Sequence, residues 1–262
     1  MRIVTWNLWW RFGPWADRQK AICSVLRGLR PDVVGLQEVW SADGTDLAEW
    51  LAGELGLHHA YAPSPNPTRW QRRLGDDRVG IGTAVLSRWP VLERAALPLP
   101  VPPALDDGRL ALYARLDAPG HQVPFFTTHL TSAHDAAGVR REQVEALQDL
   151  VAAHRHGTAF PPVVTGDFNA GPDSAEVRLL GTGDPPLRDA WDQADPGAPA
   201  ATWDPANPYL SSMEPARIDH IRVGPPGPGG LGRVRAAHRA GDGPVDGVWP
   251  SDHLAVVADL GD

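Results

Sequence analysis

The stretch Val163-Val164-Thr165-Gly166-Asp167-Phe168-Asn169 has the composition of a buried β-strand that ends in polar side chains. The same change from an apolar run to a carboxylate, an amide or an imidazole recurs along the chain. The other strands of this kind lead into or contain Asn7, Gln37-Glu38, His129, Asp219-His220 and Asp252-His253. Because a carboxylate inside an apolar strand is costly to bury unless it is paired, Asp219 is hard to explain as core packing. The pattern predicts one shared pocket at the edge of a β-sheet.

Each of these positions also has an ordinary structural interpretation. Asn7 fits a turn, Glu38 fits a solvated strand end, and Gly166-Asp167-Phe168-Asn169 fits a turn closed by the Asp side chain. That interpretation requires six separate sites along the chain to coincide by chance. We therefore favour the shared pocket.

Alternating strand and helix patterns predict an α/β chain that forms one domain over residues 1–262. The glycine- and proline-rich segment Gly224–Gly232 is predicted to be a loop between two strands rather than a domain linker. The predicted strands are Ile3–Asn7, Val33–Gln37, Thr83–Ser87, Leu110–Leu116, Val123–His129, Val163–Asp167, Ile218–Val223 and Leu254–Leu260.

Three helices are predicted from apolar periodicity and capping residues. Ala16–Arg30 and Gly138–His154 carry apolar residues on one face at a 3.6-residue period. A short helix is predicted to begin near Ser174, where Asp173 can cap it and Glu176 stands three residues later.

The composition limits which cellular compartment and which partners we expect for the protein. The chain has 262 residues and a formal charge of −8, and its single cysteine, Cys23, excludes an intrachain disulfide and a cysteine-rich zinc site. No signal peptide or apolar run of about 18 residues is found, so we expect a cytoplasmic protein, and we expect a monomer. Proteins that grip long nucleic acids usually carry a basic face, so the acidic balance counts mildly against duplex DNA as a substrate.

The polar strand ends form an ordered series: Thr5-Trp6-Asn7, Gln37-Glu38, Thr128-His129-Leu130, Gly166-Asp167-Phe168-Asn169, Arg217-Ile218-Asp219-His220 and Ser251-Asp252-His253. This series resembles the motifs of the endonuclease/exonuclease/phosphatase superfamily, which includes pancreatic-type deoxyribonucleases, apurinic endonucleases, inositol polyphosphate 5-phosphatases and neutral sphingomyelinases. The resemblance implies a four-layer α/β sandwich, in which two mixed β-sheets pack face to face with helices on both outer sides. It also implies a phosphoric ester hydrolase that depends on Mg²⁺ or Mn²⁺.

The resemblance implies a metal role for three of these residues. Glu38 is the expected ligand with Asn7 beside it, and Asp252 is a further ligand if a second metal binds. Oxygen ligands without a thiolate favour Mg²⁺ or Mn²⁺ over zinc. A divalent cation is expected because charge that develops on an anionic ester must be neutralised.

The remaining positions receive catalytic and substrate-binding roles. Either His253, oriented by Asp219, or Asp167 is expected to activate the attacking water, and both alternatives stay open. Asn169 and His129 are expected to hydrogen-bond the phosphate oxygens, and Asn7 also contacts the substrate.

The other histidines are not expected in the site. His220 is expected on the opposite face of its strand. The rest are interpreted as solvated residues of loops or helix faces: His58, His59, His121, His134, His154, His156 and His238.

Two aromatic segments are open to two interpretations each. Trp9, Trp10 and Trp15 follow the first strand, and they either rim the pocket or pack in the core. Arg69-Trp70-Gln71-Arg72-Arg73 is interpreted as a solvated loop, with contact to a phosphate substrate as the less favoured alternative.

Two other functional classes fit the sequence less well. A catalytically weak relative that only binds phosphorylated ligands would be expected to lack some of the catalytic set, and all of it is present. A nucleotide-binding α/β protein would need a glycine-rich phosphate loop after the first strand, where this chain has Asn7-Leu8-Trp9-Trp10.

Within the hydrolase class, the substrate is open. A nuclease would need a basic groove, a sphingomyelinase an exposed apolar surface, and a 5-phosphatase a pocket rich in lysine and arginine. Because Lys20 is the only lysine, such a pocket would be built from arginine. We therefore favour a small phosphate mono- or diester as the substrate, with DNA or RNA as the alternative.

Overall fold

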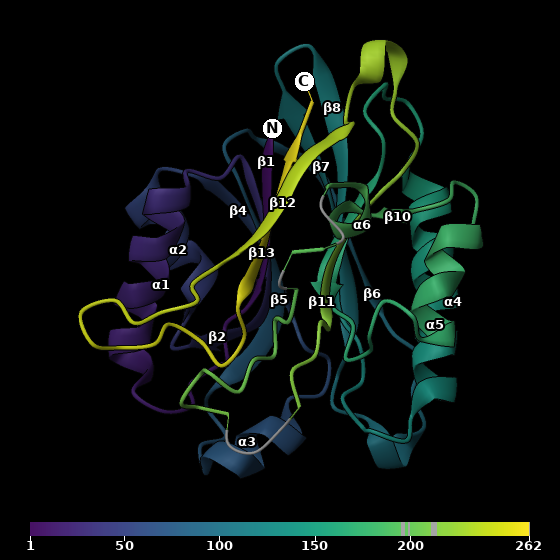
Figure 1. Cartoon of the computed structure of the whole chain (residues 1–262). Helices are drawn as coiled ribbons and strands as arrows, with labels where there is room; N and C mark the ends of the chain where they lie inside the picture. Colours follow the sequence, from purple (N-terminus) through teal and green to yellow (C-terminus); the bar gives the residue numbers. More distant parts are fainter. Residues whose placement is uncertain (195–196, 199, 211–213, 262) are drawn as a thin grey trace.

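The computed structural model describes residues 1–194, 197–198, 200–210 and 214–261. Two β-sheets pack face to face, and Figure 1 shows helices α1 and α2 outside one sheet and α4 and α5 outside the other. This arrangement confirms the expected sandwich of two mixed sheets. The helices are α1 (Trp15–Leu29), α2 (Leu47–Leu55), α3 (Thr68–Leu74), α4 (Ala137–His154), α5 (Ala175–Arg178) and α6 (Ala190–Ala194).

The first sheet has seven strands, in the order β12-β13-β1-β2-β5-β4 with β3 beside β2. Its strands are β1 (Arg2–Asn7), β2 (Val33–Ala42), β3 (Thr45–Asp46), β4 (His58–Pro63), β5 (Gly80–Ser87), β12 (Val234–Ala240) and β13 (Ala255–Leu260). Only β1 and β2 run parallel, and the other neighbours are antiparallel. The sheet therefore combines segments from both ends of the chain.

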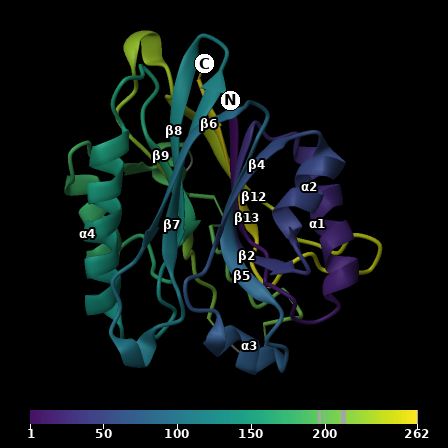
Figure 2. The same ribbon diagram turned by 180° about the vertical axis from the view of Figure 1, so that it is seen from behind.

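The second sheet has six strands, in the order β10-β11-β9-β8-β7-β6. Its strands are β6 (Val91–Pro98), β7 (Leu110–Ala118), β8 (His121–His129), β9 (Val163–Asp167), β10 (Arg188–Asp189) and β11 (Asp219–Val223). Here β8 and β9 form the one parallel pair. Figure 2 shows both sheets from behind, with α3 near the end of the sandwich that lies away from the termini.

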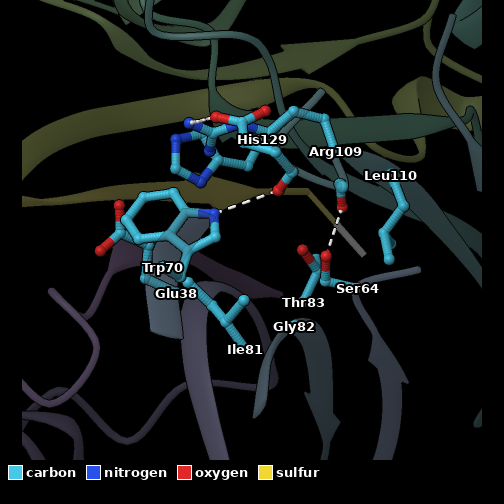
Figure 3. A pocket seen from close by; sticks show the side chains of 11 residues that line it. Glu38, Ser64, Trp70, Ile81, Gly82, Thr83, Arg109, Leu110 and His129 are labelled. Carbon is cyan, nitrogen blue, oxygen red and sulfur yellow. Dashed lines mark hydrogen bonds and ion pairs between the residues drawn. The ribbon is translucent and has the colours of Figure 1, made fainter. Parts of the chain in front are cut away.

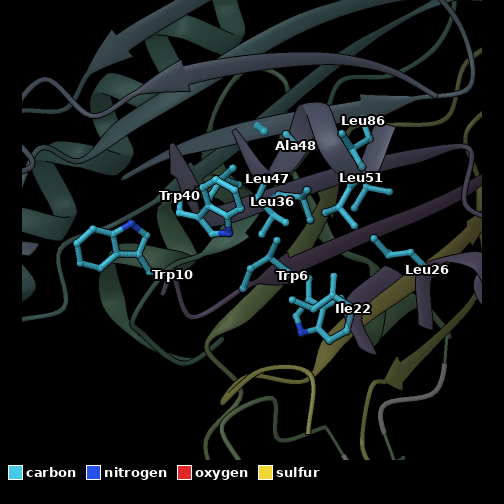
Figure 4. Packing of buried hydrophobic residues seen from close by; sticks show 14 of the residues in the cluster. Trp6, Trp10, Ile22, Leu26, Leu36, Trp40, Leu47, Ala48, Leu51 and Leu86 are labelled. Carbon is cyan, nitrogen blue, oxygen red and sulfur yellow. The ribbon is translucent and has the colours of Figure 1, made fainter. Parts of the chain in front are cut away.

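Three apolar layers hold the sandwich together. One lies between the first sheet and helices α1 and α2, one between the two sheets, and one between the second sheet and α4. Figure 4 shows the first layer, where Trp6 and Leu36 of the sheet meet Ile22 and Leu26 of α1. These residues repeat at strand and helix periods, which explains why sequence patterns located the central elements.

A polar contact also joins the two sheets. The Gln37 amide donates to the hydroxyl oxygen of Thr5 in its own sheet at 3.1 Å and to that of Thr127 in the opposite sheet at 2.9 Å. Next to this contact, a Cβ atom at Gly35 would lie only 2.4 Å from the Thr165 hydroxyl oxygen. The sheets therefore approach too closely here for any residue but glycine.

Several sequence expectations were wrong in detail. Arg69–Arg73 is not a loop but lies within helix α3, which Gly75 ends in the left-handed conformation. The cap of α5 is Ser174, whose hydroxyl oxygen accepts from the Val177 N–H, whereas Asp173 pairs with Arg178. Strands β4, β6 and β12 were missed, because many of their side chains are exposed. Four histidines assigned to loops or helices therefore lie in strands: His58, His59 and His238 in the missed strands, and His121 at the start of β8, which begins two residues earlier than predicted.

In the part of the chain that the structure describes, none of the helices has the length and apolar character needed to span a bilayer.

Candidate active site

The polar strand ends meet at one edge of the sandwich. Strand β1 finishes there with Asn7 beside Gln37 of the parallel strand β2, which continues to Ala42, and β8 and β9 finish there with His129 beside Asp167. Strand β11 runs antiparallel to β9 and begins at Asp219, directly opposite Asp167. Both sheets thus contribute to one active-site pocket, which is lined by Asn7, Trp9, Phe12, Glu38, Trp70, Arg73, Arg109, His129, Ser132, Asp167, Asn169, Trp203, Asp252 and His253.

Asp167 lies at the centre of this set. Its Oδ2 atom is 2.9 Å from Nδ2 of Asn7, 3.3 Å from Nε2 of His129 and 3.7 Å from Nε2 of His253. Its Oδ1 atom accepts the backbone N–H of Asn169 at 2.9 Å. Burial opposes ionisation of this carboxyl, but the two neighbouring imidazoles and the amide donors outweigh burial and hold its pKa below the ordinary value.

His253 is paired with Asp219 on its other side. Nδ1 of His253 lies 2.9 Å from Oδ2 of Asp219, which is fully buried. The Trp203 ring meets the imidazole edge to face at 4.7 Å, and the Trp6 indole donates to the His253 carbonyl oxygen. Burial alone would lower the pKa of His253, but the charges of Asp219 and Asp167 raise it well above the usual value. The ring is therefore fixed in orientation, with Nε2 directed toward Asp167.

Glu38 and Asp252 bring two further carboxylates to the pocket. Glu38 lies within an irregularity in the pairing of β2 with β5, between Leu36 and Val39, and has a φ of 54°, which turns its side chain away from the alternation of the strand. Burial, together with the charges of Glu38 and Asp167, raises the pKa of Asp252 to about 7. Among the described residues, neither Glu38 nor Asp252 forms an ion pair with a cationic side chain. Two buried carboxylates without a counterion fit a divalent cation with oxygen ligands.

A second group of ligand atoms also lies close together. Single atoms of Asp167, Asp219 and His253 lie within 4.8 Å of one another. Asp219 and His253 already share a hydrogen bond, and the imidazoles of His129 and His253 flank Asp167. This trio fits proton transfer and phosphate contact better than it fits a hard cation.

The remaining predicted residues divide between the pocket and the core. Asn169 and His129 line the pocket, and the Asn169 amide donates to the Leu130 carbonyl oxygen. His220 lies outside the pocket, where its ring nitrogens contact the Ala170 carbonyl oxygen and Asp189. Of the three tryptophans after β1, Trp9 lines the pocket. Trp10 is buried, and its indole N–H donates a hydrogen bond to the Gly80 carbonyl oxygen. Trp15 packs against Trp40.

Sequence reasoning missed several residues of the site. Arg18 is buried, and its guanidinium contacts the carbonyl oxygens of Leu8 and Pro250, which are close in sequence to the pocket residues Asn7 and Asp252. Phe12, Arg109 and Trp203 line the pocket without belonging to the motif series. The one available signal was a basic residue, Arg18, beside the apolar stripe of the first helix.

The comparisons with known proteins agree with this geometry. The model of the Endonuclease/Exonuclease/phosphatase family matches residues 4–253. The chain belongs to this family. Members of the endonuclease/exonuclease/phosphatase family are hydrolases that act on phosphate esters, and they generally depend on a divalent metal.

Individual family members resemble the chain over nearly all of its length. Tyrosyl-DNA phosphodiesterase 2 from Gallus gallus is 26% identical over 97% of this chain, which spans 65% of the length of that relative. An endonuclease/exonuclease/phosphatase from Beutenbergia cavernae has a TM-score of 0.76 and 27% identity, covering 99% of this chain and 71% of that one. The D. rerio TDP2 structure, complexed with a single strand DNA product, has a TM-score of 0.75 at 23% identity and covers 98% of this chain and 97% of its own.

Proposed function

We propose that the protein hydrolyses a phosphate mono- or diester by in-line attack of an activated water, with Glu38, Asn7 and Asp252 as the residues that hold Mg²⁺ or Mn²⁺. The convergence of Asn7, Glu38, His129, Asp167, Asp219 and His253 from both sheets on one pocket carries this proposal. When bound, the cation would neutralise charge on the phosphate oxygens. The carboxylates of Glu38 and Asp252, which have no ion-pair partner in the described part of the chain, support this ligand set.

Asp167 is proposed as the group that takes the proton from water. Both of its oxygens accept hydrogen bonds from amides, one from Asn7 and one from the Asn169 backbone, which favours its ionised form. His253 faces it through Nε2 while Asp219 holds Nδ1. We propose that His253 and His129 donate to phosphate oxygens as charge develops there.

A small phosphate ester is the proposed substrate class, as the acidic charge of the chain favours. Attack on a nucleic acid end is a second candidate. It is supported by the D. rerio TDP2 structure with a DNA product and by Trp203, an aromatic residue that lines the pocket and suits base stacking. One domain, a monomeric state and a cytoplasmic location stay predictions.

The test is a screen of phosphate esters with Mg²⁺, with Mn²⁺ and with a chelator. It covers single- and double-stranded DNA, RNA, nucleotides, inositol phosphates, sphingomyelin and p-nitrophenyl esters. We expect turnover with at least one ester, loss of that turnover in chelator, and recovery on adding the metal. Turnover that survives the chelator, or no turnover on any ester, would contradict the proposal.

A further inference from the structure

Helix α3 places a basic and aromatic surface beside the proposed metal ligands. Its residues Trp70 and Arg73 line the active-site pocket together with Glu38 and His129. Arg109, which immediately precedes strand β7, lines the same pocket. Figure 3 shows Trp70, Arg109, Glu38 and His129 from the side of a second, smaller pocket, which these four residues also line. None of these basic residues belongs to the motif series.

Arg73 is an exposed cation that aromatic rings hold in place. Its guanidinium carbon lies 4.8 Å from the Phe12 ring centroid and 5.5 Å from that of Trp70. Among the described residues, no carboxylate pairs with Arg73. Cation–π contacts orient the guanidinium without neutralising its charge, so its N–H groups remain available to an anion.

Arg109 is a buried cation in the same wall. Its Nη2 atom lies 2.8 Å from Asp107 Oδ2 and donates to the Ser132 hydroxyl oxygen at 3.3 Å. Its Nε atom has no partner among the described residues, although the side chain is only 3% exposed. The Arg109 guanidinium carbon also lies 5.1 Å from the Trp70 ring centroid, so the Trp70 ring contacts the cations of both Arg73 and Arg109.

The charges on this wall leave a positive excess. Asp107 is the one carboxylate paired with this cluster in the described part of the chain, and Arg69 shares it with Arg109 at 3.5 Å. Against the three cations Arg69, Arg73 and Arg109 stand the carboxylates of Asp107 and Glu38, which leaves an excess of one positive charge. Of the proposed metal ligands, Glu38 lies beside Trp70, Asp107 and Arg109 in this wall, whereas Asp252 lines only the active-site pocket.

We propose that Arg73 and Arg109 form a second anion subsite, which binds a phosphate group of the substrate other than the one being hydrolysed. This inference rests on the proposed function and narrows its substrate class to esters that carry at least two phosphates. Two kinds of compound carry two or more phosphates in this way: a nucleotide chain and an inositol polyphosphate. Trp203 in the same pocket suits stacking of a base, which a nucleotide has and an inositol polyphosphate lacks, so the experiment separates the two sources.

The kinetic test compares two chromogenic esters with wild type and two matched variants. One ester is the p-nitrophenyl ester of thymidine 5′-phosphate, and the other carries an additional 3′-phosphate. Arg73→Gln removes the pocket charge, whereas Arg72→Gln removes an exposed charge from the same helix that does not line the pocket. We expect Arg73→Gln to raise the KM of the two-phosphate ester about tenfold more than that of the one-phosphate ester, whereas Arg72→Gln leaves the ratio of the two values unchanged.

A binding measurement separates this inference from the proposed hydrolysis. Titration of pTpT, pT and inositol bisphosphate into the protein with chelator present needs neither metal nor turnover. We expect the two-phosphate ligands to bind more tightly than pT, and we expect Arg73→Gln but not Arg72→Gln to remove the difference. Preference for pTpT over inositol bisphosphate would assign the nucleotide source. Equal binding of pT and pTpT, or equal effects of the two variants, would overturn the subsite even if hydrolysis is found.

Discussion

Nη1 of Arg18 donates a 2.9 Å hydrogen bond to the carbonyl oxygen of Pro250 and so joins helix α1 to the segment that carries Asp252 and His253. The guanidinium is buried, and its other bonds go to backbone carbonyl oxygens of residues 8, 9, 10 and 12. All five N–H groups are therefore used. Burial lowers the pKa of Arg18 to about 10, which leaves it charged at neutral pH. The buried guanidinium of Arg18 therefore joins the two segments that flank the pocket.

Arg18→Lys should weaken both the fold and turnover. Lysine keeps the charge but has three donors in place of a planar fork of five, so carbonyl groups lose their partners. We expect the free energy of unfolding in urea to fall by about 2–4 kcal/mol. The expected drop in kcat is at least tenfold at a temperature where the variant is folded. Arg27→Lys is the matched control, because Arg27 lies on the same helix and contacts Glu54 at the surface.

Loss of the His253–Asp219 pair should lower turnover by removing a donor and its orientation. We expect His253→Gln to reduce kcat by a factor on the order of 10²–10⁴, and Asp219→Asn to cause a smaller reduction. Because the two side chains act through one hydrogen bond, the double variant should be about as slow as His253→Gln. Steady-state kinetics checks this, with the exposed His58→Gln as control. Additive losses in the double variant would argue against a functional pair.

Glu38→Gln should leave the melting temperature in chelator unchanged or raise it, and should reduce the stabilisation that the metal gives. In chelator, the substitution removes repulsion between Glu38 and Asp252, so the variant should melt at or above the temperature of wild type. With Mg²⁺ or Mn²⁺, wild type should gain stability through binding while the variant gains much less. Thermal melts at several metal concentrations give both values. An equal rise in Tm for both proteins would remove Glu38 from the ligand set.

Asp189 should make stability depend on acidity. Its Oδ2 atom lies 2.8 Å from Arg217 Nη1, 3.2 Å from Arg222 Nη2 and 3.3 Å from His220 Nδ1. Burial works against ionisation, but the His220 contact and the two guanidinium groups hold the pKa of Asp189 below its ordinary value. The carboxylate therefore stabilises the fold above the unfolded-state pKa of about 3.9, and this contribution is lost as pH falls toward the folded-state pKa.

The matching experiment compares wild type with Asp189→Asn. We expect the variant to unfold at lower urea concentration at pH 7, and the gap between the two proteins to narrow below about pH 4. A gap that is constant between pH 7 and pH 3.5 would mean that packing rather than charge explains the loss.

The polar residues of the site could be predicted because each one is marked by the apolar residues directly before it in the sequence. Each of Asn7, Glu38, His129 and Asp167 follows its own apolar run, and they meet because β1 pairs in parallel with β2 and β8 pairs in parallel with β9. The contact between Arg18 and Pro250 has no such signal, because the acceptor is a backbone oxygen 232 positions away in the sequence. Strand β4 was missed because it begins with two exposed histidines and ends in a proline.

Helix α3 was missed for a different reason. It has seven residues, three of them arginine, and lies between Pro67 and Gly75. Its one buried side chain is Trp70, so it shows no apolar stripe. Its position is fixed by contacts with residues far away in the chain, such as the Trp70 indole on the Asp107 carbonyl oxygen at 3.1 Å.

The pairing of β1 with β13 has a consequence for biosynthesis. The second sheet is continuous in the chain and can assemble once the ribosome has released residues 91–223. The first sheet cannot close until β13 emerges, a delay of a few seconds at the usual rate of translation. During that interval, β1 is an unprotected edge strand able to pair with another nascent chain. Slowing elongation before residue 255 should therefore promote aggregation, and a chaperone that shields β1 should prevent it.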